Sequence, residues 1–230
     1  MRPRQTILLG LLLLVPVLAF LFLYGFGRNH YALPTYLPER SDSVRTPAGG
    51  WQRDTVFHRV RPFYMRMVSG RSLVSTDVSK DLCIVQFYAP GEAGEAASRA
   101  LARLQERFRP EPRVRLLTLM PTEGTTAATD TKLEKLGEQY GTIAGKWVIG
   151  AAPVDTLRRL AQYEFGQTAL RPEHFPFRPA TEPGNLLPGR LLLVDKAQHV
   201  RGYYDATDKY EVERLITEVN VLLYTYDNRR

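Results

Sequence analysis

A run of twenty residues without a charge, from residue 7 to residue 26, is the feature that most constrains this chain. As a helix rising 1.5 Å per residue, the run would span roughly 30 Å, the thickness of a bilayer's hydrocarbon core. A cleaved signal peptide is the competing interpretation, but its apolar region is only about 7 to 15 residues long and small residues follow it. Here the run ends in Tyr24-Gly25-Phe26-Gly27-Arg28, and no cysteine follows it for a lipid anchor. We therefore expect an uncleaved transmembrane helix over 7–26, with a tolerated kink at Pro16.

The charges beside this run orient it. Arg2 and Arg4 precede it, and Arg28 follows it directly. A short N-terminus that carries positive charge stays inside the cell. We expect residues 1–6 in the cytoplasm and the main domain outside the inner membrane, in the periplasm if the cell has two membranes. Membrane lipid is then one partner of the chain.

The next segment has the composition of a tether. Residues 27–51 contain Pro34, Pro38 and Pro47 and show little periodic hydrophobicity, so we expect them to be extended. The remaining residues, 52–230, leave room for one domain of ordinary size that buries a core without disulfide bonds.

Charge and cysteine content exclude two classes of function. The net charge is +7, and the three arginines beside the apolar run supply part of it, leaving 28 basic and 24 acidic residues elsewhere. The basic residues form no dense cluster, so nucleic acid is not an expected partner. Cys83 is the only cysteine. It forms no disulfide within the chain, and two-thiol redox chemistry within one chain is therefore impossible.

The hydrophobic pattern predicts strands that alternate with helices. Phe63, Met65 and Met67 alternate with polar residues, which indicates a strand with one buried face that turns at Ser69-Gly70 into 71–74. Residues 82–88 form an apolar run typical of a strand buried on both faces. Further strands are expected at 114–120, 147–149, 190–195 and 200–204, helices at 92–108, 131–140, 154–165 and 208–226, and a long loop at 167–189. This order predicts an α/β fold with a mostly parallel central sheet, the arrangement of the thioredoxin fold with an N-terminal β-hairpin extension.

Four segments carry a resemblance to a known family: Arg103-Leu104-Gln105-Glu106-Arg107-Phe108, Leu192-Leu193-Val194-Asp195-Lys196, Val200-Arg201-Gly202-Tyr203-Tyr204-Asp205-Ala206-Thr207-Asp208 and Val212-Glu213-Arg214-Leu215-Ile216. Through them the chain resembles the SCO/SenC family, and the similarity covers most of the chain from about residue 27. The resemblance implies a membrane-anchored thioredoxin-like protein that binds copper and helps to assemble cytochrome c oxidase.

The metal ligands of that family are missing. The resemblance implies two cysteines, separated by three residues, where a central strand turns into a helix, and counting from Arg103 places them at Pro90 and Gly94. The family's histidine ligand falls at Leu187. Copper(I) prefers thiolates and copper(II) accepts imidazole, and none of these three residues offers either. Thiol–disulfide exchange also needs an attacking thiolate and a resolving partner. We therefore expect no cofactor, no metal site and no catalytic residue, and hence no enzyme.

Other residues are candidates to replace the missing ligands. Cys83 lies inside a predicted central strand, where cysteine is usually inert, although it is the candidate for a single-cysteine thiol oxidoreductase. Met65, Met67 and His58 are the candidates for a copper chaperone with relocated ligands, but alternation assigns Met65 and Met67 to the core.

The remaining histidines and two acids carry weaker hypotheses. His30, His58, His174 and His199 show no ligand spacing, so surface or turn positions are expected for each. Glu92 and Glu95 could hold a hard cation, but acids are also common in the first turn of a helix because they face its positive end.

The leading hypothesis is a degenerate SCO/SenC-like binding or assembly module in cytochrome c oxidase biogenesis or copper handling. Its expected partner is a membrane protein complex or a homologue that kept its ligands.

Overall fold

The computed structural model describes residues 14–18, 20–21, 33–47, 49–67, 72–78, 82–122, 126–167 and 186–228. It divides into two compact units, Met1–Ala32 and Leu33–Arg230. In the first unit, residues 14–18 and 20–21 are helical and their apolar side chains are largely exposed. Across the described ranges, no helix is both long enough and apolar enough to cross a membrane. Most of 7–26 lies outside these ranges, so the transmembrane helix stays a prediction.

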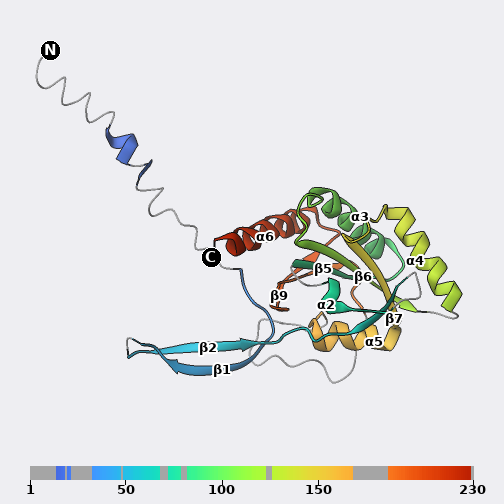
Figure 1. Cartoon of the computed structure of the whole chain (residues 1–230), viewed down its shortest axis with the longest axis horizontal. Helices are drawn as coiled ribbons and strands as arrows, with labels where there is room; N and C mark the ends of the chain where they lie inside the picture. The colour runs from blue at the N-terminus through green and yellow to red at the C-terminus, as the bar shows by residue number, and fades with distance from the viewer. Residues whose placement is uncertain are drawn as a thin grey trace, which may run out of the picture. The chain divides into compact units, whose positions relative to one another are not determined.

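The second unit is built on a seven-stranded sheet (Figure 1), with strand order β4-β3-β7-β6-β5-β8-β9. Its strands are β3 (Tyr64–Met67), β4 (Ser72–Val74), β5 (Leu82–Phe87), β6 (Val114–Thr122), β7 (Trp147–Pro153), β8 (Arg190–Val194) and β9 (Val200–Asp205). The three central strands β5, β6 and β7 are mutually parallel. The pairings β3–β4, β3–β7, β5–β8 and β8–β9 are antiparallel.

The expectation of a mostly parallel sheet is therefore corrected to a mixed sheet with a parallel centre. Both predicted hairpins, β3–β4 and β8–β9, are present, and each adds an antiparallel pairing where it joins the centre. The hairpin β3–β4 precedes the central strands in sequence but pairs with the last of them, β7. Sequence order does not reveal such a long-range pairing, since it depends on which edge of the sheet remains open.

Helices cover both faces of this sheet (Figure 1). The helices are α2 (Ser75–Val78), α3 (Glu92–Arg107), α4 (Thr126–Tyr140), α5 (Val154–Arg159), which continues as a π-helical turn η1 (Leu160–Glu164), and α6 (Lys209–Asp227). One core lies beneath α3, α4 and α6, and a second lies against α5 and η1. In β5, Leu82 and Ile84 enter the first core, whereas Cys83 and Val85 enter the second. This confirms the expected strand buried on both faces.

The expected tether instead contains a β-hairpin. Strands β1 (Pro38–Arg45) and β2 (Trp51–Phe57) pair antiparallel in a sheet of their own and project from the rest of the unit (Figure 1). Most side chains of both strands are exposed. A polar hairpin exposed on both faces has no hydrophobic alternation, and for this reason the sequence pattern does not predict it.

The residues before this hairpin belong to the folded unit. Leu33 and Leu37 are buried, at 5% and 0% exposure. Tyr36 N donates to Val200 O at 2.9 Å, and His58 N donates to Leu37 O at 2.9 Å. The guanidinium of Arg201 donates to the carbonyl oxygens of Leu33 and Pro34 at 2.6 and 2.9 Å. The compact unit thus begins at Leu33, not at residue 52.

Leu37→Ala tests this revised boundary. We expect the free energy of unfolding to fall by about 2–5 kcal/mol, because the substitution leaves a cavity in a closed core. Denaturant unfolding followed by fluorescence measures it. Val44→Ala is the control, because Val44 is 49% exposed in the hairpin and its loss should change stability by no more than about 0.5 kcal/mol. An unchanged free energy of unfolding for Leu37→Ala would instead support an extended tether over residues 27–51.

Candidate functional site

The three positions that the resemblance assigns to metal ligands converge at one edge of the sheet. Pro90 and Gly94 lie where β5 passes into α3, and Leu187 precedes β8, the neighbour of β5. A Cβ added to Gly189 would lie 3.3 Å from Cβ of Ala93, so the chain before β8 contacts the first turn of α3. The fold therefore brings the three positions together, but their side chains offer no donor for copper.

The backbone at residue 94 also leaves no space for a side chain. A Cβ added to Gly94 would overlap the carbonyl oxygen of Ala89, and this neighbour is backbone, which cannot rotate away. A cysteine at residue 94 therefore requires the segment before α3 to move. Copper does not fit the side-chain chemistry of these three positions, and residue 94 has no room for a ligand side chain.

A buried hydrogen-bond network holds Gly94 in place. Gln86 Nε2 donates to Gly94 O at 3.0 Å, and Ser98 Oγ lies 3.1 Å from both of these atoms. Thr118 Oγ1 donates to Gln86 Oε1 at 3.2 Å and accepts from Trp147 Nε1 at 3.0 Å. These side chains are almost fully buried, and such networks stabilise a single arrangement when every polar group is paired. Hydrophobic periodicity does not single out Gln86 or Ser98; a glutamine within an apolar strand is the available signal.

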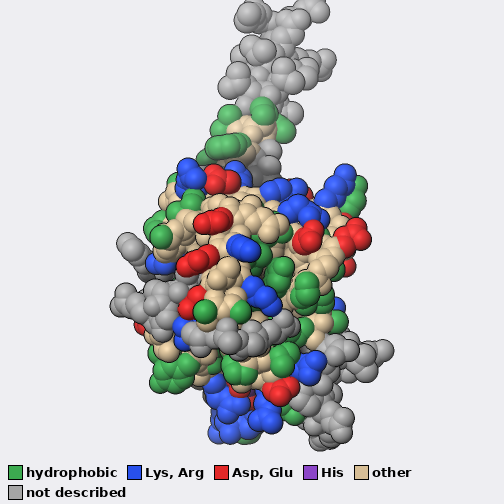
Figure 2. Space-filling model, turned by 90° about the vertical axis from the view of Figure 1, so that its right-hand side faces the viewer, with side chains coloured by type: hydrophobic (Ala, Val, Ile, Leu, Met, Phe, Trp, Pro, Cys, Tyr) green, Lys and Arg blue, Asp and Glu red, His purple; other side chains and the backbone are tan. Residues whose placement is uncertain are grey.

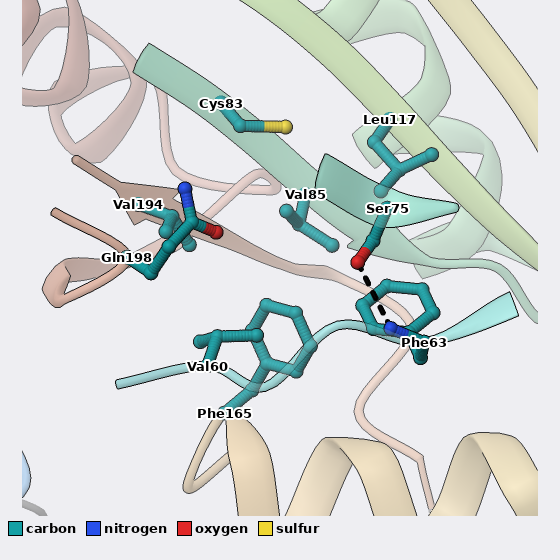
Figure 3. A pocket seen from close by; sticks show the side chains of 9 residues that line it. All are labelled: Val60, Phe63, Ser75, Cys83, Val85, Leu117, Phe165, Val194 and Gln198. Carbon is teal, nitrogen blue, oxygen red and sulfur yellow. Dashed lines mark hydrogen bonds between the residues drawn. The ribbon is translucent and has the colours of Figure 1, made fainter. Parts of the chain in front are cut away.

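Cys83 lies on the opposite face of β5 and at the opposite end from Pro90. Its side chain is 1% exposed and borders a small apolar hollow of about 10 Å³ beside Val85, Phe63 and Phe165 (Figure 3). Burial raises the pKa of the Cys83 thiol to about 12. At pH 7 the thiolate is then roughly one part in 10⁵. The geometry supports the expected inert cysteine and gives no support to thiol exchange.

The relocated-ligand hypothesis finds little support in this arrangement. Met65 is 2% exposed and packs over Gly150, where a Cβ would overlap its side chain. Phe63 is also buried, so the alternation in this strand correctly indicates a core face, and Met67 is half-buried. Within the described ranges, no group of three or more His, Cys, Asp or Glu side chains is placed to hold a metal ion.

The other candidate residues lie apart. Glu92 and Glu95 are exposed, and Glu95 pairs with Arg99 at 3.5 Å. His199 is half-buried 3.8 Å from Asp195, and burial lowers its pKa. His30 and His174 lie outside the described residues.

The expected surface position of His58 is wrong, because this histidine joins distant parts of the fold. It is 9% exposed, and its Nδ1 lies 2.6 Å from Oε1 of Glu39 in β1. Its Nε2 lies 3.2 Å from Oε2 of Glu164 in η1. Arg61 donates to Glu164 through its backbone N at 2.9 Å and through Nε at 2.8 Å. The two carboxylates lie at opposite ring nitrogens, so the cluster is an ion-pair network between the base of the β1–β2 hairpin and η1. Partners 19 and 106 residues away explain why local sequence does not predict it.

The network shifts the pKa of two of its members. Hydrogen bonding to Glu164 raises the pKa of His58, burial opposes this, and Glu39 reinforces it. Burial alone would raise the pKa of Glu164, but hydrogen bonds from His58 and Arg61 lower it to about 2.

Comparison with known proteins identifies the fold. The sequence matches no protein-family model and no curated protein. Among solved structures, a SCO1/SenC family lipoprotein from Bacillus anthracis is similar with a TM-score of 0.55 at 12% identity, over 72% of this chain and 95% of that chain. BsSco, a member of the Sco family of cytochrome c oxidase assembly proteins, is similar with a TM-score of 0.51 at 14% identity, over 71% of this chain and 92% of that chain. At these identities the likeness concerns the fold, and it confirms the predicted α/β, thioredoxin-like architecture.

The His58 network predicts a specific pH dependence of stability. Because the folded-state pKa of His58 is raised, its contribution is complete below the ordinary value of 6.5 and is lost as pH rises through the folded pKa. The free energy of unfolding of the unsubstituted chain, measured in denaturant from pH 5 to 9, should therefore fall relative to His58→Gln over this range. His199→Gln is the control: the lowered pKa of His199 makes its contribution complete above 6.5 and weaker at lower pH. Parallel curves for the unsubstituted chain and His58→Gln would contradict the network.

Gly94→Ala tests whether the backbone at residue 94 excludes a side chain. Alanine usually stabilises a helix relative to glycine by about 1 kcal/mol, but overlap with Ala89 O should cost about 1–3 kcal/mol and reverse the sign. Gly137→Ala, within α4, is the matched control, because its Cβ would lie 3.2 Å from Oγ1 of Thr142, the end of a side chain that can rotate. Denaturant unfolding of both variants measures the difference. Greater stability of Gly94→Ala would show that the segment yields readily and that the site could accept a side chain.

Proposed function

We propose that this chain is a membrane-anchored, extracytoplasmic SCO/SenC-like protein that acts as a binding or assembly module without a metal or redox site of its own. In this proposal, residues 7–26 hold the domain on the outer side of the inner membrane. The domain contributes a folded surface to cytochrome c oxidase biogenesis or copper handling, and it performs no catalytic step. Its partner is a membrane protein complex or a homologue that retains the metal ligands.

The observation that carries the proposal is the closed backbone at Gly94. A site that had lost only its side chains would keep the space for them. Here the Ala89 carbonyl fills the position of a Cβ, and Gln86 and Ser98 hydrogen-bond the Gly94 carbonyl from below. The vacated edge is thus rigid protein surface, which suits recognition better than chemistry. The family assignment itself is supported by the sequence segments that resemble SCO/SenC proteins and by the two similar structures.

The burial of Cys83 supports the absence of a redox role. An intermolecular disulfide needs an accessible thiolate, and this thiol is both enclosed and held in its protonated form. Restoring exchange would require the second core to open, which costs far more than a local loop movement. We therefore assign the chain to the class of binding proteins and not to that of thiol oxidoreductases.

Copper(I) titration of the purified full-length chain in nanodiscs, under reducing conditions and against a competing chelator, tests the proposal. We expect the chelator to retain all the copper, because the soft side chains of Cys83 and Met65 are buried in the core. Stoichiometric copper retained by the chain would overturn the proposal and revive the relocated-ligand chaperone. Cys83→Ser is the control for weak capture by the thiol, and a combined Met65, Met67 and His58 substitution would locate a relocated site.

A further inference from the structure

The β1–β2 hairpin separates its charged side chains between two faces. Residues directly opposite one another in an antiparallel pair lie on the same face. In this register Arg45 lies opposite Trp51, Ser43 opposite Arg53, and Ser41 opposite Thr55, and together they form what we call the tryptophan face. The other face, the aspartate face, holds the pairs Asp42–Asp54, Arg40–Val56 and Val44–Gln52. The tryptophan face therefore carries two positive charges and no acid.

The charges of the tryptophan face are available for a ligand. Arg45 and Arg53 are exposed, and neither forms an ion pair with an acid of the described chain. On the aspartate face, by contrast, Arg40 pairs with Asp42 at 2.9 Å. The unpaired positive charge of the hairpin is thus concentrated on one face.

Trp51 occupies the tip of this face. Its side chain is 74% exposed, whereas the other tryptophan of the chain, Trp147, is 3% exposed. The adjoining turn is fixed, because Thr46 N donates to Gly50 O at 2.8 Å and Thr46 Oγ1 accepts from Gly50 N at 3.1 Å. Trp51 therefore stands exposed at the start of β2, next to the ordered turn of the hairpin. The hairpin itself projects from the rest of the unit (Figure 1).

The chemistry of this face fits a lipid surface. Tryptophan is enriched at the membrane–water interface because its ring is amphipathic, and arginine is attracted to anionic headgroups. Two copies of the chain would not pair through this face, since four arginines would meet without an acid. The hairpin also lies close in sequence to the proposed anchor: Pro38 follows Phe26 by twelve residues, a distance of at most about 40 Å.

We propose that the tryptophan face docks on an anionic phospholipid surface, with Trp51 at headgroup depth and Arg45 and Arg53 against lipid phosphates. This inference rests on the proposed membrane location, and it adds a second contact with the bilayer beyond the anchor. The contact fixes the direction in which the hairpin points, while the aspartate face is turned away from the anionic surface.

Tryptophan fluorescence of the full-length chain measures the docking without an added label on the protein. We would reconstitute it in vesicles that contain doxyl-labelled phosphatidylcholine, with or without phosphatidylglycerol, and measure quenching of tryptophan fluorescence. Quenching is expected in anionic vesicles and should be greatly reduced in zwitterionic ones. Trp51→Phe should abolish the quenching, because Trp147, which is buried, is then the only tryptophan. Far-UV circular dichroism confirms that each variant is folded.

A charge-matched pair of variants tests the two arginines. Arg45→Gln with Arg53→Gln should lower the ratio of docked to undocked hairpin roughly 30-fold, the effect expected for two basic side chains at an anionic surface. Arg103→Gln with Lys135→Gln removes the same charge from exposed positions in α3 and α4, and should leave the quenching unchanged. Equal loss in both pairs would overturn the proposed face and leave only a general effect of net charge.

Resistance to alkaline carbonate extraction reports the anchor separately. Extraction-resistant chains with unquenched Trp51 would overturn the docked face while the anchor stands. Chains that are extracted but still co-sediment with anionic vesicles and show quenched Trp51 would support the docked face and overturn the anchor. An acidic protein partner that protects Trp51 in the absence of lipid quenching would also overturn the lipid assignment.

Discussion

Burial of β5 on both faces determines much of what surrounds it. All six residues of Leu82–Phe87 are buried, and alternate side chains enter separate cores. A shift of one residue would exchange every side chain between the two cores, so the register is strongly fixed. In this register Gln86 faces α3, where Ser98 and the Gly94 carbonyl satisfy its amide. Cys83 faces the other core, away from the edge where the resemblance places metal chemistry.

The sequence predicts the elements whose pattern is local and misses those that depend on distant partners. Helix α3, strand β5, the β8–β9 hairpin and helix α6 all carry clear periodicity, and the structure confirms them close to the expected limits. The β1–β2 hairpin has no apolar face, so periodicity gives no indication of it. The network of His58, Glu39 and Glu164 joins three segments, and no spacing in the sequence encodes that meeting.

The candidate site shows the same division. The resemblance assigns metal ligands to Pro90, Gly94 and Leu187, and the structure has Pro90 and Gly94 where β5 passes into α3 and Leu187 just before β8. It does not predict that the backbone would close over residue 94, since that depends on the path of Ala89 and on the hydrogen bonds of Gln86. A fold persists while its site changes, because the cores that stabilise it lie elsewhere. At this edge the Ala89 carbonyl lies close to residue 94, and Gln86 and Ser98 both donate to the Gly94 carbonyl.

The contacts of Leu33 and Pro34 with Arg201 have a mechanical consequence. Arg201 also donates to Asp195 Oδ2 at 3.1 Å, so the carbonyl oxygens at the start of the folded unit are tied through one guanidinium to the β8–β9 turn. Tension applied to the chain before Leu33 would act first on the hydrogen bonds of Arg201 to Leu33 and Pro34. The hydrogen bond from Tyr36 N to Val200 O would then transmit it to β9. The hairpin β1–β2 follows these contacts in the chain. It would therefore carry no load until the hydrogen bonds of Arg201 to Leu33 and Pro34 broke. A pull from the N-terminal side would therefore strain the edge of the main sheet and leave the projecting hairpin slack.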